Sequence, residues 1–210
     1  MRGIILYMLL YAAMFSQDSR AQAVATSVSY QTSGSVYTQN FDGLPAGGSF
    51  VLTGKGPFNI SGSPINGTSM AGWQLLMTAG TGANASFAVG TGSSTGNGVY
   101  SFGSSGSADR ALGTLASGSG IYAIGVLITN NTGGLLNRFT ISFTAEQWRK
   151  GGSTNKNNWN FRYKTGNLMN MDQTDLLNNA NLNFSSVINT SQASGLNGNK
   201  SLVVPVVHRR

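Results

Sequence analysis

The chain beyond residue 24 is built from short alternations of apolar and polar residues, separated by turns rich in Gly, Ser and Asn. Residues 139–144 alternate strictly, with one apolar face and one hydroxyl-bearing face, which predicts a half-buried strand. Residues 121–129 are apolar on both faces and predict a central strand. The polar segment 130–134 between them predicts a hairpin turn.

The same criterion predicts strands along the rest of the chain. They are 24–30, 36–41, 49–52, 73–77, 85–89, 99–102, 159–163, 182–184 and 202–207. Pro205 favours a sheet edge for the last of these. Residues 175–181 predict at most a short helical turn. Closely spaced strands without long helices predict an all-β fold, an antiparallel β-sandwich of jelly-roll type.

The first 23 residues have the pattern of a secretory signal peptide. Arg2 supplies the positive charge, residues 4–15 form an apolar run, and Ala21-Gln22-Ala23 matches a cleavage site. An uncleaved anchor is the alternative, but spanning a bilayer takes roughly 20 apolar residues. We therefore expect cleavage before Val24, a secreted or cell-surface location without a transmembrane segment, and a single β-sandwich domain over residues 24–210.

Composition narrows the chemistry that this domain can perform. The sequence has no Cys and one His, His208 near the end, which argues against thiolate catalysis, a Ser-His-Asp triad and His-based metal sites. We expect no cofactor and no metal. The net charge of +7 reflects scarce acids more than clustered bases, so it does not predict nucleic-acid binding.

Two short charged clusters, Asp109-Arg110 and Glu146-Gln147-Trp148-Arg149, are the strongest local features. A glycosidase needs two carboxylates flanking one bond, and Asp109 with Glu146 is the pair to consider. Each lies close in sequence to an Arg, which would lower its pKa and make it a poor general acid. The sequence therefore predicts a structural ion-pair or hydrogen-bond cluster of Asp109, Arg110, Glu146 and Arg149, and no enzyme.

Aromatic residues offer candidate ligand contacts. Trp148, Trp159 and Tyr163 could form a stacking platform for sugar rings, although aromatics on a β-sandwich more often belong to the core. The partner would be a surface glycan or an extracellular protein. Asp172 and Asp175 lie in an oxygen-rich segment that matches no EF-hand pattern, so a solvated loop is expected there.

Four segments also resemble a known family. They are VYTQNFDGLP (36–45), YSFGS (100–104), ADRALG (108–113) and FTAEQWR (143–149). Their order and spacing resemble secreted bacterial domains found upstream of PEP-CTERM or type IX sorting tails. The resemblance implies a secreted, noncatalytic jelly-roll module, with no catalytic residues to carry over.

The chain departs from that family after LNGN (196–199), where members continue into an acidic loop and a closing strand. This predicts a C-terminally truncated member that lacks its final strands and exposes the edge of strand 36–41. We expect an exported, noncatalytic module for binding or display at the cell surface. The alternatives are a carbohydrate-binding accessory module of a secreted hydrolase and a nonfunctional truncation product.

Overall fold

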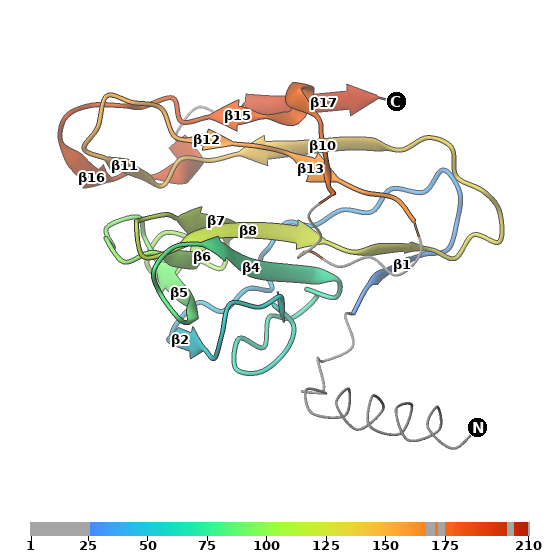
Figure 1. Cartoon of the computed structure of the whole chain (residues 1–210), viewed down its shortest axis with the longest axis horizontal. Helices are drawn as coiled ribbons and strands as arrows, with labels where there is room; N and C mark the ends of the chain where they lie inside the picture. The colour runs from blue at the N-terminus through green and yellow to red at the C-terminus, as the bar shows by residue number, and fades with distance from the viewer. Residues whose placement is uncertain (1–25, 167–170, 172–174, 201–203, 210) are drawn as a thin grey trace, which may run out of the picture.

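The chain folds into two layers of β-strands (Figure 1). The computed structural model describes residues 26–166, 171, 175–200 and 204–209. In these residues the helical segments are two single-turn 3-10 helices, η1 (Ala180–Leu182) and η2 (Gly198–Lys200). The predicted all-β class is therefore confirmed. The predicted signal peptide, residues 1–23, lies outside the described residues.

The lower layer in Figure 1 contains two small sheets. One has the order β2-β5-β6-β7 and the other the order β3-β4-β8. Their strands are β2 (Ser49–Leu52), β3 (Phe58–Asn59), β4 (Trp73–Ala79), β5 (Ala85–Gly90), β6 (Gly98–Phe102), β7 (Ala111–Leu115) and β8 (Ile121–Val126). Neighbouring strands are antiparallel except β5 and β6, which are parallel.

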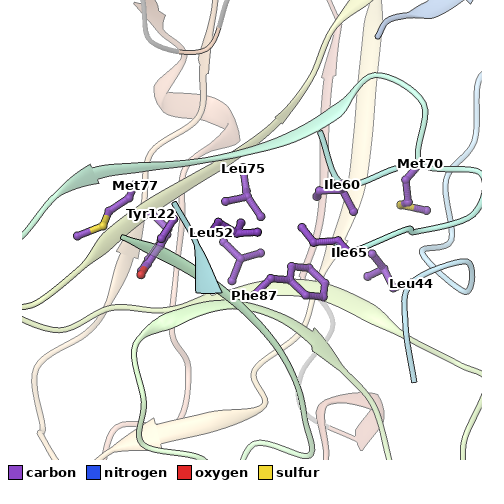
Figure 2. Packing of buried hydrophobic residues seen from close by; sticks show 11 residues of the cluster. Leu44, Leu52, Ile60, Ile65, Met70, Leu75, Met77, Phe87 and Tyr122 are labelled. Carbon is purple, nitrogen blue, oxygen red and sulfur yellow. The ribbon is translucent and has the colours of Figure 1, made fainter. Parts of the chain in front are cut away.

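The main core fills the space between these two sheets (Figure 2). Alternation along β5 places Ala85 and Phe87 in this core, and Val99 enters it from β6. The other fully or nearly buried members are Leu44, Leu52, Ile60, Ile65, Met70, Leu75, Met77 and Tyr122. Removing this apolar surface from water is the main stabilising contribution to the lower layer.

Strand β6 is buried on both faces, and all five of its residues are buried. Val99 faces the main core, whereas Tyr100 and Phe102 belong to a second cluster with Trp148. A strand covered on both sides explains why its sequence shows no polar face. The second cluster is where the two layers meet.

The upper layer is made of the strands after residue 139 (Figure 1). They are β10 (Thr140–Ala145), β11 (Arg149–Gly151), β12 (Asn158–Trp159), β13 (Arg162–Tyr163), β14 (Leu177–Asn178), β15 (Phe184–Ser185), β16 (Ala193–Gly195) and β17 (Val204–Arg209). The antiparallel pairs are β10 with β17, β11 with β16, β12 with β15, and β13 with β14. Exposure alternates along β10 as the sequence predicts.

The predicted hairpin at 130–134 is wrong. The run 121–129 divides into β8 and β9 (Ile128–Asn130), and β9 pairs in parallel with β1 (Val28–Tyr30). The chain then crosses from the lower to the upper layer before β10 begins (Figure 1). Residues 132–134 do form bends, but the segment connects the two layers instead of two neighbouring strands.

The predicted strand 36–41 is also wrong, because that segment has no strand pairing. Gln39 accepts a hydrogen bond from the Phe41 backbone N–H (2.8 Å), and Asn40 accepts one from that of Asp42 (3.1 Å). Phe41 has a positive φ of 66°. Local side-chain acceptors therefore displace the ladder that the alternation suggested. The terminal strand β17 pairs with β10.

Candidate functional site

Trp148 lies where the two layers meet, between β10 and β11. Its side chain is only 5% exposed. The indole is nearly parallel to the ring of Phe102, with centroids 6.0 Å apart, and Phe102 stacks on Tyr100 at 4.9 Å. Because Phe102 and Tyr100 belong to β6, this stack of three rings joins the upper layer to the four-stranded sheet. We call this region the Trp148 junction.

Several contacts fix the indole in place. Its Nε1–H donates to Oε2 of Glu146 (2.8 Å), and its backbone carbonyl accepts from the Leu196 N–H (2.8 Å). Gly198 lies directly against the ring, so a Cβ at that position would overlap the indole. The prediction that Trp148 is a surface platform is therefore wrong, since the ring is enclosed and cannot stack on a ligand.

The neighbours of Trp148 connect the surrounding loops. Oε1 of Gln147 accepts from the backbone N–H groups of Val187 and Ile188, each at 2.9 Å, and its Nε2 donates to the Ile188 carbonyl (2.8 Å). Nη1 of Arg149 donates to the carbonyls of Gly92 and Ser93, both at 3.1 Å. These two side chains therefore attach the loops at 92–93 and 187–188 to one segment.

Arg110 is a buried cation, 5% exposed. Its Nε donates to Oγ of Ser101 (2.9 Å), and its Nη2 donates to the carbonyl of the same residue. Burial lowers the pKa of Arg110, and the nearby charge of Asp109 opposes that shift. These hydrogen bonds replace the water that a buried guanidinium loses.

Asp109 accepts a hydrogen bond from Nδ2 of Asn199, within the LNGN segment. In the described part of the chain, the ion pair present is Lys164–Asp175 (2.6 Å), and none joins Asp109, Arg110, Glu146 and Arg149 to one another. The ion-pair form of the predicted cluster is therefore wrong, and what the structure shows instead is hydrogen bonding of each side chain to another group. The four charged side chains gather near the Trp148 junction, but each bonds to a different neutral partner.

Trp159 and Tyr163 lie in the upper layer, among half-buried aromatic rings. Trp159 stacks on Phe184 with centroids 5.5 Å apart, and Phe143 contacts Phe184 edge-on at 5.7 Å. Tyr163 contacts Phe139 edge-on at 6.3 Å. Trp159 and Tyr163 are thus partly exposed to solvent and partly packed against other aromatic rings. The structure does not bring them together with Trp148.

The predicted solvated loop lies partly outside the described residues, because Asp172 is not among them. Asp175 is exposed and accepts from Nζ of Lys164. Within the described ranges, no three His, Cys, Asp or Glu side chains gather where they could hold a metal ion. No helix in those same ranges has the length and apolar character needed to cross a bilayer.

The candidate list drawn from the sequence missed Gln147, Gly198 and Asn199. Gln147 lies in the charged cluster at 146–149, and Gly198 and Asn199 lie in the LNGN segment. A glycine inside a polar loop gives no indication that a tryptophan distant in sequence lies against it. Comparison with protein families, with curated proteins and with solved structures finds no match to this chain.

Proposed function

We propose that the protein is an exported, noncatalytic β-sandwich module that binds or displays a partner at the cell surface. The N-terminal pattern of a signal peptide supports export. The all-β architecture supports a scaffold role, since rigid sheets are well suited to carry exposed loops. We also propose membership of the secreted bacterial domains that precede PEP-CTERM or type IX sorting tails, on the resemblance of the four segments.

One observation carries the noncatalytic part of this proposal. The polar side chains of residues 146–149 contact the protein itself, with Glu146 on the Trp148 indole and Arg149 on backbone carbonyls. A general acid or base must instead reach a proton on the substrate. Glu146 therefore serves best as the acceptor that orients the indole.

Substitution of Glu146 tests this assignment. Glu146→Gln keeps an acceptor oxygen for the indole N–H, so the melting temperature should stay close to that of the unmodified protein. Glu146→Ala removes the acceptor, and we expect a loss of about 1 kcal/mol, typical of one hydrogen bond. The purified protein should be assayed for hydrolysis of a panel of polysaccharides. Hydrolysis that Glu146→Gln abolishes without changing stability would refute the noncatalytic proposal.

Cell fractionation tests the location. The protein should be found in the medium or on the cell surface, and N-terminal sequencing should begin at Val24. Retention of Met1 on a cytoplasmic form would contradict export. The control is a chain lacking residues 1–23, which should remain inside the cell and still fold.

A second candidate function is a carbohydrate-binding accessory module of a secreted hydrolase. The observation that favours it is the partial exposure of Trp159 on the upper layer, since indole rings stack on sugar faces. Affinity electrophoresis against insoluble and soluble glycans should then show retardation that Trp159→Ala abolishes and Trp159→Phe largely keeps. Equal migration of all three proteins on every glycan would contradict this second candidate.

A further inference from the structure

The loop between β9 and β10, residues 131–139, forms one end of the molecule (Figure 1). We call it the tip loop. Leu135 is 93% exposed and Phe139 is 48% exposed, with Leu136 also exposed between them. Single exposed apolar residues are ordinary on protein surfaces. Three exposed apolar residues within five positions form a cluster, and exposed apolar clusters mark interaction sites.

The tip loop is held in shape by hydrogen bonds just before the leucines. Nδ2 of Asn130 donates to the Gly134 carbonyl (2.8 Å), and Oγ1 of Thr132 donates to Oδ1 of Asn130 (2.8 Å). Neither Gly133 nor Gly134 would bring a Cβ near any other part of the protein. Leu135 therefore follows a preorganised turn that projects into solvent, which lowers the entropy lost on binding.

The apolar surface continues onto the upper layer. The ring of Phe139 contacts Tyr163, and Tyr163 is the register partner of Leu177, which is exposed. Partners in an antiparallel pair project to the same face of the sheet. Phe139, at the end of the tip loop, thus connects the loop to a half-buried aromatic surface.

A second loop lies beside the tip loop. The Asn131 backbone N–H donates to the Tyr30 carbonyl (2.8 Å), and the Tyr30 hydroxyl donates to the carbonyl of Ser35 (2.8 Å). Val36, the next residue, is strongly exposed. Two loops from distant parts of the sequence therefore present large aliphatic side chains at the same end of the molecule.

Among the described residues at this end, positive charge predominates. Across residues 26–41 and 127–145 the sole charged residue is Arg138, which is exposed beside Phe139. Arg162 on β13 is also exposed, and the nearby Asp175 is neutralised by Lys164. An apolar tip next to exposed arginines complements an anionic surface that has an apolar interior.

We propose that the tip loop docks on an anionic lipid bilayer, with Leu135 and Leu136 inserted among the acyl chains and Arg138 against the lipid phosphates. A second copy of the chain fits less well, because a stable protein interface buries about 800 Å² on each partner. A tip of a few side chains offers far less area than that to the rigid surface of another protein. Lipids, in contrast, can close around such a tip. The inference rests on the proposed cell-surface role.

Vesicle flotation tests the proposal with purified residues 24–210. The protein should float with phosphatidylcholine vesicles that contain phosphatidylglycerol and much less with phosphatidylcholine alone. Leu135→Ser should weaken vesicle affinity about tenfold, because an inserted leucine side chain is lost. The matched control is Val51→Ser, since Val51 is 73% exposed on β2, away from the tip, and its loss should leave affinity unchanged.

Arg138→Gln tests the electrostatic part. We expect about a fivefold weaker affinity for the anionic vesicles, the contribution of one basic residue near a charged membrane. Added salt should weaken binding of the unmodified protein and have less effect on Arg138→Gln. Equal affinity for neutral and anionic vesicles would overturn the charge argument.

A fluorescent label gives a second measurement that does not depend on affinity. The chain has no cysteine, so Leu135→Cys and Val51→Cys each allow a single environment-sensitive dye to be attached. Vesicles should shift the emission of the dye to shorter wavelength at position 135 and leave it unchanged at 51. No shift at 135, or a dimer in solution that Leu135→Ser dissociates, would overturn the proposal.

The experiments distinguish failure of the lipid inference from failure of the proposed function. An exported protein that ignores vesicles refutes the lipid inference and leaves the proposed function standing. A protein that binds vesicles but stays in the cytoplasm refutes the proposed function alone.

Discussion

Replacing Trp148 with alanine removes the ring that connects the two layers. The indole is 5% exposed and packs between Phe102 and Gly198, so truncation leaves a cavity that neither layer can readily fill. Substitutions of this kind cost about 3–5 kcal/mol. The lost hydrogen bond to Glu146 adds little, because that carboxylate is exposed and water can take the place of the indole N–H.

The expected loss is measurable by thermal unfolding. A change of 1 kcal/mol shifts the midpoint of a protein of this size by about 2–4 °C, so Trp148→Ala should lower it by about 6–20 °C. Circular dichroism is the appropriate signal, since the chain has three tryptophans and the mutation removes one fluorophore. Guanidinium denaturation of the same proteins should give a lower midpoint with a similar slope.

A double-mutant cycle makes the test specific to the contact. Gly198→Ala places a methyl group where the indole lies, so it should destabilise the unmodified protein. In the Trp148→Ala background the space is empty, and the same change should cost much less. Trp148→Phe is the conservative control and should lose less than half as much stability as Trp148→Ala.

Two outcomes would refute this reasoning. A midpoint unchanged by Trp148→Ala would mean that the ring stack does not hold the layers together. Strict additivity of Trp148→Ala and Gly198→Ala would mean that the two positions are not in contact. Loss of ligand binding at unchanged stability would instead restore Trp148 as a ligand contact.

Two further predictions follow from the charged residues. Arg110→Lys should lose about 1–3 kcal/mol, because an ammonium lacks the two-nitrogen fork with which the guanidinium bonds both Oγ and the carbonyl of Ser101, which leaves a buried acceptor unpaired; unchanged urea denaturation would contradict this. The hydrogen bond from Lys164 lowers the pKa of Asp175. The pair therefore stabilises the folded protein at pH values above the ordinary Asp pKa. This contribution is lost as the pH falls through the lowered pKa of the folded state. NMR titration should show the Asp175 pKa rising toward its ordinary value in Lys164→Gln, and an unshifted titration would argue against the pair.

The strands of the lower layer were largely predictable from sequence. Residues 49–52, 73–77, 85–89 and 99–102 alternate or are apolar on both faces, and each lies in a strand. The pattern of these strands reflects burial against the main core, and the spacing of apolar residues in a sequence indicates such burial directly. Strand β7 is not predicted by the pattern, because its leucines, Leu112 and Leu115, are three residues apart and break the two-residue alternation of a strand.

The alternation of apolar and polar residues did not predict which strands pair, or whether a given side chain is buried or exposed. The segment 36–41 alternates, yet the side chains of Gln39 and Asn40 bond to their own backbone and prevent strand pairing. Trp148 and Trp159 both follow polar residues in the sequence, but one is enclosed between layers and the other is partly exposed. That difference depends on Phe102 and Gly198, which are distant in sequence.

The composition of the main core has a consequence for the order of folding. Every residue of that core, including those packed at its margin, lies between Phe41 and Ile124. A ribosome delivers this stretch before the upper layer, and domains form as their contacts become available. We therefore expect the lower layer to close before the rest of the chain folds, with β6 then presenting Tyr100 and Phe102 as a surface for the upper layer. The C-terminal third would complete the protein by docking Trp148 onto a template that already exists.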